Sequence, residues 1–175
     1  MKRIGLLVTA LACVALAAPA GAQDSRLDLG VGYSMVPADD VTLHGWQASI
    51  GWPLSSRVAI VADLSGHYGS LDGTDVSDFM AMAGPRLSLL GGNRVSPFVH
   101  VLAGIVRSKA SVSVFEVDIA ESSTEFGGVA GGGLDIRMGD SWGLRLQGDM
   151  RVVKVEDETA TDPRIGAGVV FRFGK

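Results

Sequence analysis

The sequence predicts an all-β fold: an eight-stranded antiparallel up-and-down barrel that crosses a membrane, preceded by a cleaved signal peptide. Eight stretches alternate apolar and polar residues with a period of two, which is the side-chain period of a β-strand. The connections between them alternate long and short, so all long loops share one end. After the first 22 residues, no stretch holds the roughly 18 unbroken apolar residues of a membrane helix.

The first residues have the composition of a secretory signal peptide. Lys2 and Arg3 precede an apolar run over 4–18, and small residues at 20–22 form a cleavage site. The sequence therefore predicts a signal peptide over 1–22 and a mature barrel domain over 23–175. An uncleaved membrane anchor is the alternative, and Pro19 with the small residues after it disfavours that anchor.

The composition of the mature chain excludes several classes of function. Cys13 is the only cysteine and lies in the predicted signal peptide, so no disulfide, zinc knuckle or thiol nucleophile is expected. A lipoprotein cysteine is disfavoured because the apolar run continues past it. Without Lys2 and Arg3, the mature chain has 13 of the 15 basic residues and all 19 acidic ones, so its net charge is −6. This negative charge disfavours nucleic acid as a partner. We expect no cofactor, and no three acids have the spacing of a calcium loop.

The hairpin over 126–152 shows the alternation most clearly. One face carries Leu134 and Leu144, whereas the other carries Asp135 and Arg145 among glycines. A tight turn at 139–141 joins the two strands, and a symmetric register places Asp135 opposite Arg145 as a cross-strand ion pair. The predicted strands are 26–36, 45–52, 57–68, 78–89, 97–107, 126–138, 142–152 and 164–173.

The strand over 97–107 has the weakest pattern because both of its faces are largely apolar. Val99 and Val101 share one face and Phe98 and His100 share the other, and the sequence leaves open which of the two faces is inside. The polar segments 37–43, 69–76, 109–125 and 154–162 are predicted as the long loops, and 109–125 is expected to extend its flanking strands beyond the sheet.

Aromatic residues on the apolar face fall near the strand ends and predict two interfacial girdles, which is typical of barrels in a bilayer. Ten tilted residues span about 23 Å, close to the ~25 Å apolar band of such barrels. The predicted girdle residues are Tyr33, Trp46, Tyr68, Phe79 and Phe126 beside the long loops, and Trp52, Trp142, Phe171 and Phe173 beside the short turns.

A soluble barrel of the lipocalin kind, with the apolar face inside, has the same period and the same closure. The polar face disfavours it. That face consists mostly of Gly, Ser, Arg and Asp, which fit the narrow interior of an eight-stranded barrel, rather than the Lys, Glu and Thr of a water-facing sheet. Only Arg107 interrupts the apolar face, at a strand exit where its side chain can reach the interface.

Charged residues on the polar face predict a network inside the lumen, because buried charges are tolerated when they are paired. We interpret this network as a plug of ion pairs. The alternative is a narrow path for ions or small solutes. The excess of arginine in the predicted set would give that path a preference for anions. The predicted residues are Asp63, Arg86, Asp135, Arg137, Arg145, Asp149, Arg151 and Arg172, with His67 and His100 nearby.

Catalysis and loop binding are the remaining alternatives. Ser65 and His67 share a face near the outer end of one strand, but no esterase motif surrounds them, so a lipid-A-modifying enzyme is disfavoured and no catalytic residue is assigned.

The long loops are acidic, which suggests contact with the divalent cations of lipopolysaccharide or with a basic ligand. The acids are Asp39, Asp40, Asp72, Asp75, Glu116, Asp118, Glu121, Glu156, Asp157, Glu158 and Asp162.

Taken together, four segments resemble the small eight-stranded outer-membrane β-barrel proteins of the OmpA/OmpX type. They are AGPRLSL (83–89), SPFVHVLAG (96–104), GGGLDIR (131–137) and the ending RIGAGVVFRFGK. The resemblance implies a Gram-negative outer membrane, periplasmic turns, extracellular loops and insertion by the barrel-assembly machinery. It also implies a surrounding of lipid and lipopolysaccharide, and we expect a monomer. The family's chain ends on an aromatic residue, whereas here Gly174 and Lys175 follow Phe173.

Overall fold

The computed structural model describes residues 27–37, 41–71, 74–90, 94–114, 117–155 and 158–174. The predicted signal peptide lies outside them. No helix in the described ranges is long and apolar enough to cross a membrane. The strands are β1 (Leu27–Pro37), β2 (Thr42–Pro53), β3 (Val58–Leu71), β4 (Thr74–Ser88), β5 (Val95–Val114), β6 (Val117–Arg137), β7 (Trp142–Val155) and β8 (Glu158–Phe173).

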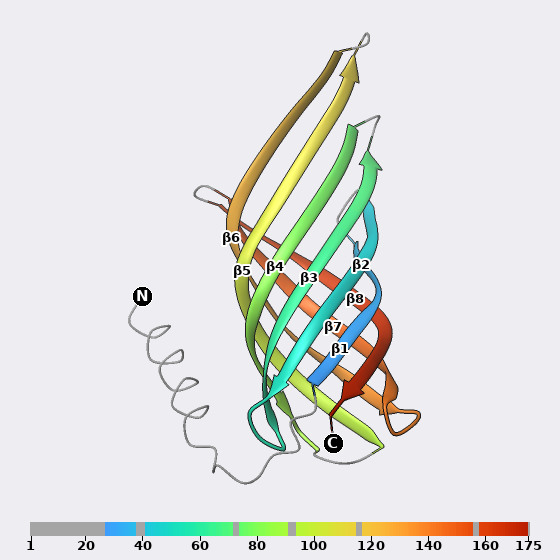
Figure 1. Ribbon diagram of the computed structural model, residues 1–175. Helices are drawn as coiled ribbons and strands as arrows, with labels where there is room; N and C mark the ends of the chain where they lie inside the picture. Colours follow the sequence, from blue (N-terminus) through green and yellow to red (C-terminus); the bar gives the residue numbers. More distant parts are fainter. Residues whose placement is uncertain are drawn as a thin grey trace, which may run out of the picture.

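The eight strands form a closed antiparallel barrel in which each strand pairs with the next along the chain. β1 and β8 complete the ring through a ladder that runs from Leu27↔Phe173 to Met35↔Ile165. Figure 1 shows the strongly tilted strands, with β1 beginning and β8 ending at the end of the short turns. Closure removes sheet edges, so the backbone groups of the paired region bond to neighbouring strands. The predicted fold is confirmed.

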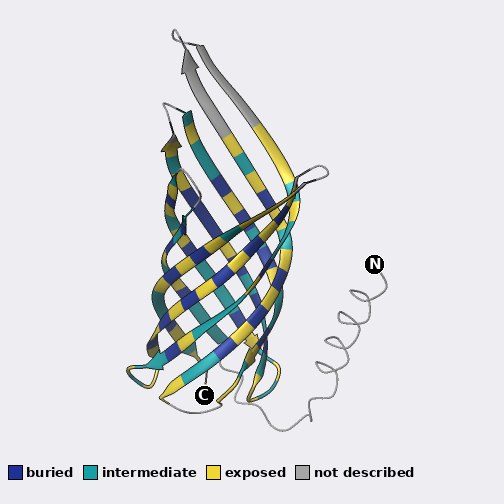
Figure 2. Cartoon of the chain, turned by 180° about the vertical axis from the view of Figure 1, so that it is seen from behind, coloured by how far each residue is buried: buried dark blue, intermediate teal, exposed yellow. Residues whose placement is uncertain are grey.

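Most charged side chains of the described strands point into the barrel, and most of the side chains on its outside are apolar. In the 126–152 hairpin, Arg145 and Asp135 are 4% and 8% exposed, whereas Leu146 is 48% exposed. Asp135 faces Arg145 in the register, as the symmetric hairpin predicts. Figure 2 shows buried and exposed residues alternating along the strands. This orientation excludes the lipocalin-like arrangement, because that barrel would bury the leucines.

The structure decides the orientation of the fifth strand, which the sequence leaves open. Phe98 and Leu102 are buried inside the barrel, and Val99 and Val101 are exposed on its outside. The inner face of β5 is apolar because it contributes to a hydrophobic cluster in the lumen. Alternation of polarity fails on such a strand, because one face contacts lipid and the other contacts an apolar part of the interior.

Two predicted long loops are wrong, because most of their residues extend the strands. β3 continues to Leu71 and β4 begins at Thr74, while β7 continues to Val155 and β8 begins at Glu158. Beyond the apolar band both faces of a hairpin meet water, so polar residues pair as strands without the alternation that lipid requires. Pairing of β5 with β6 likewise continues out to Val114↔Val117, as expected for 109–125.

The hairpin of β5 and β6 reaches far beyond the rest of the barrel. Its strands have 20 and 21 residues, about twice the ten that cross an apolar band of ~25 Å. In Figure 1 it extends past the neighbouring β3–β4 hairpin at the end opposite the short turns. The protein therefore carries a long two-stranded projection at that end.

All nine predicted girdle residues are exposed on the outside of the barrel. Near the long-loop end, the Trp46 and Phe79 rings lie 6.3 Å apart on either side of Gly66. A Cβ atom at Gly66 would lie 2.9 Å from Trp46 Nε1, so the glycine leaves room for the indole. Tyr33 stacks on His44, and its hydroxyl forms a hydrogen bond with His44 Nδ1.

We predict that Gly45→Ala destabilises the barrel, because its Cβ atom would lie 1.9 Å from the carbonyl oxygen of Gly66. The free energy of unfolding should fall by about 1–3 kcal/mol. Urea unfolding in lipid vesicles, followed by tryptophan fluorescence, measures this change.

Gly148→Ala is the matched control, because a Cβ atom there meets no atom within 4 Å. Its free energy of unfolding should stay within about 0.5 kcal/mol of the wild type. Equal effects of the two substitutions would contradict the close approach of β2 and β3 at Gly45.

Candidate functional site

The lumen contains a network of ion pairs whose formal charges balance among the described residues. Buried charges are stable only when they are paired and hydrogen-bonded, and here every member lies within 4 Å of an opposite charge. The network consists of Arg86, Arg145, Arg151, Arg164 and Arg172 with Asp28, Asp63, Asp78, Asp135 and Asp149.

The lower tier lies toward the short turns and is organised by Arg145. Its guanidinium donates two hydrogen bonds to Asp135, at 2.7 and 2.8 Å, in a bidentate arrangement. Across the lumen, Arg86 donates to Asp28 at 2.9 Å. The Phe98 ring lies 5.1 Å from the Arg145 guanidinium and 5.4 Å from that of Arg86, so one aromatic ring contacts two cations. This tier joins strands that lie far apart in the ring.

The middle tier is organised by Asp149, whose side chain has no solvent exposure. Its carboxylate accepts hydrogen bonds from His100 and Gln147, both at 2.8 Å, and from Arg164 at 2.7 and 3.0 Å. Arg164 also donates to Asp63 at 2.8 Å and to Ser65 at 3.2 Å. These contacts link β3, β5, β7 and β8 across the centre of the barrel.

The upper tier lies toward the long hairpins and is organised by Asp78. Arg151 donates to Asp78 at 2.5 Å, and Ser108 donates to the other oxygen of Asp78 at 2.6 Å. The Nε and Nη1 atoms of Arg151 are buried without a hydrogen-bond partner among the described residues. On the other side of the lumen, Ser34 and His67 form a buried hydrogen bond of 2.6 Å.

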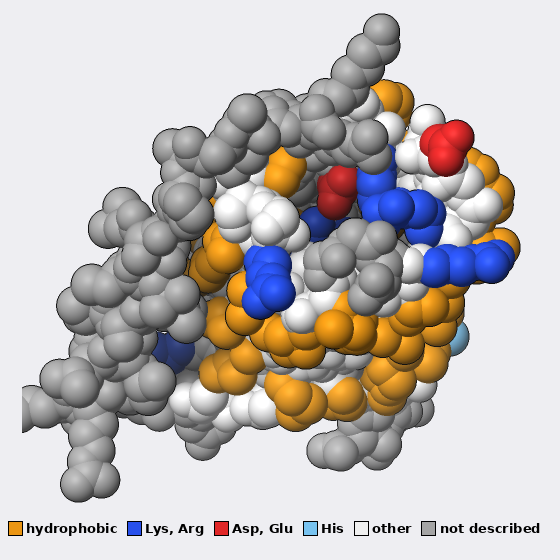
Figure 3. Space-filling model, turned by 90° about the horizontal axis from the view of Figure 1, so that it is seen from below, with side chains coloured by type: hydrophobic (Ala, Val, Ile, Leu, Met, Phe, Trp, Pro, Cys, Tyr) orange, Lys and Arg blue, Asp and Glu red, His pale blue; other side chains and the backbone are white. Residues whose placement is uncertain are grey.

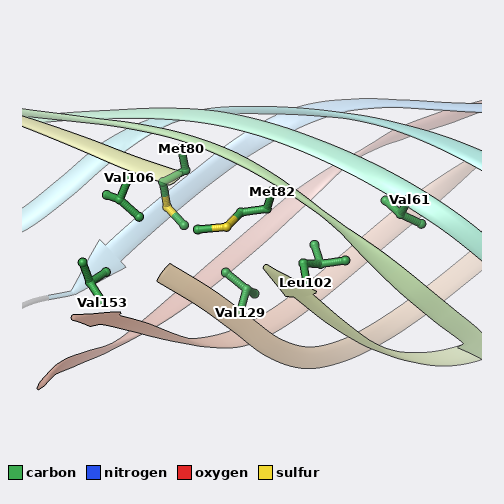
Figure 4. Packing of buried hydrophobic residues seen from close by; sticks show 7 residues of the cluster. All are labelled: Val61, Met80, Met82, Leu102, Val106, Val129 and Val153. Carbon is green, nitrogen blue, oxygen red and sulfur yellow. The ribbon is translucent and has the colours of Figure 1, made fainter. Parts of the chain in front are cut away.

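A hydrophobic cluster fills the space along the wall from β3 to β7. Figure 4 shows these side chains projecting from neighbouring strands into the barrel. The interior therefore holds apolar side chains as well as ion pairs. The cluster consists of Val61, Met80, Met82, Leu102, Val106, Val129 and Val153.

The Ser34–His67 pair places a hydroxyl next to a possible base, but the other parts of a catalytic triad are absent at this position. Both residues have no solvent exposure. His67 Nδ1 has no partner in the described part of the chain, and the nearby Asp78 is engaged by Ser108 and Arg151. A base that is not oriented by a third group is a weak activator of a nucleophile. Ser65, which shares a face with His67 in the sequence pattern, contacts Arg164.

Basic side chains gather around the end with the short turns, inside a belt of hydrophobic ones (Figure 3). Arg57 and Arg94 are exposed in the turns after β2 and β4. Arg137, which was predicted to belong to the lumen network, is half-buried at this end and makes none of the ion pairs between described residues. Among the described residues, Arg57, Arg94 and Arg137 therefore form a group of cations at this end that lies outside the ion-pair network.

Seven of the eight predicted lumen residues lie in the network, and the sequence prediction missed three others. Arg164 and Asp78 lie at the ends of predicted strands. At such positions a neighbouring loop or an uncertain strand boundary makes it hard to tell from the sequence that the side chain points inward. Asp28 was assigned to the polar face but not to the network. Adding these three removes the apparent excess of arginine, because the paired set has equal numbers of both charges.

The described residues contain no group of three or more metal-ligating side chains. Among the acids of the predicted loops, Asp75 accepts a hydrogen bond from Ser70 and Asp162 is half-buried in β8. The placement of the other acids, or of their side chains, is outside the described residues. These are Asp39, Asp40, Asp72, Glu116, Asp118, Glu121, Glu156, Asp157 and Glu158.

A closed eight-stranded barrel with an apolar exterior, aromatic girdles and a polar interior defines a transmembrane β-barrel. The sequence matches the model of the family described as outer membrane protein beta-barrel domain over residues 6–173. The chain therefore belongs to this family and is an outer-membrane protein. No curated protein matches it.

Solved structures with the same fold include three barrels of low sequence identity. Ail, the attachment invasion locus protein of Yersinia pestis, was solved with the heparin analogue sucrose octasulfate. It has 17% identity and a TM-score of 0.63, over 86% of this chain and 100% of Ail. Neisserial surface protein A has 14% identity and a TM-score of 0.61, over 87% and 99%. The N-terminal barrel of Pseudomonas aeruginosa OprF has 18% identity and a TM-score of 0.55, over 86% and 98%.

We predict that Asp149→Ala lowers the free energy of unfolding by about 3–5 kcal/mol, because it leaves buried donors of His100, Gln147 and Arg164 without their acceptor. Asp75→Ala, which removes an exposed hydrogen bond with Ser70, should cost about 1 kcal/mol or less. Urea unfolding of both variants in vesicles measures the difference.

A triple variant, Asp149→Ala with Arg164→Met and Asp63→Asn, separates pairing from packing, because Arg164 pairs with both Asp149 and Asp63. It should be more stable than the double variant Asp149→Ala with Arg164→Met, because that double variant leaves the buried Asp63 carboxylate without its cation. If the triple variant is less stable than the double variant by the cost of a further independent loss, the three residues do not act as one paired set.

Proposed function

We propose that the protein is an outer-membrane barrel whose lumen is closed by its own side chains and which acts through its surface. The observation that carries this proposal is the balanced set of arginines and aspartates that bridges the lumen in three tiers. Contacts such as Arg164 with Asp63 and Arg86 with Asp28 join residues that are 101 and 58 positions apart in the chain. Such contacts cross the interior rather than follow its wall.

Two features support a closed lumen. The formal charges of the paired set cancel, so the network does not offer the fixed excess of one sign that attracts a permeant ion. Beside the lower tier, a cavity next to Gln47, Ser49 and Arg145 has a volume of only about 10 Å³. This volume is about that needed by a single water molecule.

The long β5–β6 hairpin supports a role at the cell surface. It extends beyond the apolar band, so it places residues in the medium without contributing to the membrane seal. Ail and Neisserial surface protein A, which share the fold, are named for attachment and for the surface. The acidic loops suggest that this chain meets divalent cations of lipopolysaccharide or a basic ligand.

A narrow anion path is the second candidate function. The unpartnered Nε and Nη1 atoms of Arg151 favour it, because they are buried donors that an anion in the upper lumen could bind. The balanced charge of the rest of the network opposes it.

Catalysis is not part of the proposal. Ser34 and His67 are fully buried, and among the described residues His67 Nδ1 has no hydrogen-bond partner that would orient the ring. If the protein modified lipid A, expression in a host that lacks such enzymes would change the lipid A mass. We expect the mass spectrum of lipid A to be the same with and without the protein.

Export, assembly and oligomeric state are further parts of the proposal. We infer cleavage after Ala22, insertion by the barrel-assembly machinery despite the Gly174–Lys175 extension, and a monomeric barrel surrounded by lipid. N-terminal sequencing of the protein from outer membranes tests the cleavage site. An intact N-terminus at Met1 would contradict it.

We predict that the wild-type barrel shows no steady conductance in planar bilayers. The double variant Asp149→Gly with Arg164→Gly removes the middle tier and should produce frequent openings. Single-channel recording measures both, and Asp75→Gly on the exposed hairpin is the control that should stay closed. A steady, anion-selective current through the wild type would overturn the closed lumen and favour the second candidate.

A further inference from the structure

Three basic side chains lie together on the outside of the barrel, around the most exposed aromatic residue. Phe126 on β6 is 80% exposed. Arg107 and Lys109 on β5 are exposed, as is Lys154 on β7, so the four residues occupy three neighbouring strands. We refer to Arg107, Lys109, Phe126 and Lys154 as the outer patch.

The register places Arg107 and Lys154 on the two strands that flank Phe126, while Lys109 pairs with Ser122, farther out along β6. Phe126 pairs with Ile105, which is two residues before Arg107 on the same face of β5. On its other side, Gly127 pairs with Val153, so Lys154 lies beside Phe126. The cations therefore stand on both sides of the ring.

The height of the patch matches the outer aromatic girdle. Arg107 pairs directly with Phe79 on β4, and Phe79 contacts Trp46. Aromatic girdles mark the level of lipid headgroups. Long basic side chains at this level place their charge among headgroups while their stems stay apolar.

The patch is confined to one side of the barrel. Every other arginine or lysine in the described residues belongs to the lumen network or lies at the short-turn end, so the outer half of the wall from β8 through β1 to β3 carries none. At the same height that wall presents His44, Tyr68 and Met35. Asp75 on β4 is the acid on the same outer face, and its carboxylate already bonds to Ser70. A ring of snorkelling residues would surround the barrel, whereas this cluster marks one sector.

We propose that the outer patch is a binding site for the phosphate groups of lipopolysaccharide in the outer leaflet, with Phe126 inserted among its sugars and acyl chains. A guanidinium and two ammonium groups can each donate to phosphate oxygens. An exposed aromatic ring next to them is stable at the boundary between headgroups and acyl chains. The site rests on the outer-membrane location and does not depend on whether the lumen conducts.

The test compares two variants that remove the same charge. Arg107→Gln with Lys154→Gln removes the cations on either side of Phe126, and Arg57→Gln with Arg94→Gln removes two exposed cations at the short-turn end. The mature protein is folded in detergent, and its fold is checked by heat-modifiable migration on a gel. Native mass spectrometry then measures binding of bis-phosphorylated lipid A, of enzymatically dephosphorylated lipid A and of phosphatidylglycerol.

We expect the Arg107/Lys154 variant to bind phosphorylated lipid A about tenfold or more weakly than the wild type, because it loses two charge-assisted contacts. The Arg57/Arg94 control should bind within twofold of the wild type. Phe126→Ser should also weaken binding, and dephosphorylated lipid A should bind the wild type no better than it binds the variant.

Several results would overturn the proposal. One is equal loss in the two charge variants, which would indicate a nonspecific effect of net charge. Another is unchanged binding by the Arg107/Lys154 variant. A third is equal binding of phosphatidylglycerol and lipid A, which would indicate general attraction to anionic lipid. Preferential binding of soluble sucrose octasulfate over lipid A would point instead to a sulfated polysaccharide as the occupant.

Discussion

Most of this structure follows from the requirement that no backbone amide or carbonyl is left unpaired in lipid. An unsatisfied group in hydrocarbon costs several kcal/mol, and strands meet the requirement only when their sheet closes. The ladder between β1 and β8 provides that closure here. Once the ring is closed, one face of every strand must contact lipid and the other must fill a narrow interior. This is why apolar and polar residues alternate along most of the strands.

The interior of so small a barrel is filled in two ways. Charges from different strands bridge it, and an apolar cluster that includes Met80 and Leu102 occupies the rest. An ion pair at this depth is stable only if its remaining hydrogen-bonding groups are satisfied, which is why Asp149 accepts from three side chains. The network fixes the relative positions of strands that do not pair with one another.

Beyond the apolar band, the same strands serve a different purpose. There the hairpin of β5 and β6 continues as a ladder out to Val114↔Val117, beyond Gly127↔Val153, where the described ladder of β6 with β7 ends. The basic residues of the outer patch occupy the transition between the two regimes. Arg107 shares a face with Ile105, so a single strand passes from acyl chains to headgroups within two residues.

The amino-acid sequence by itself determined the number of strands, the faces of most of them and the aromatic girdles, because a period of two and a cost for charge in lipid act locally. It also determined the Asp135–Arg145 pair, since a tight hairpin fixes its own register. Only the tertiary structure decided that Arg164 joins Asp63 and Asp149, and that Asp28 joins Arg86, because these residues lie far apart in the chain. It also extended the outer hairpins and placed Lys154 beside Phe126, since pairing across the barrel depends on where neighbouring strands end.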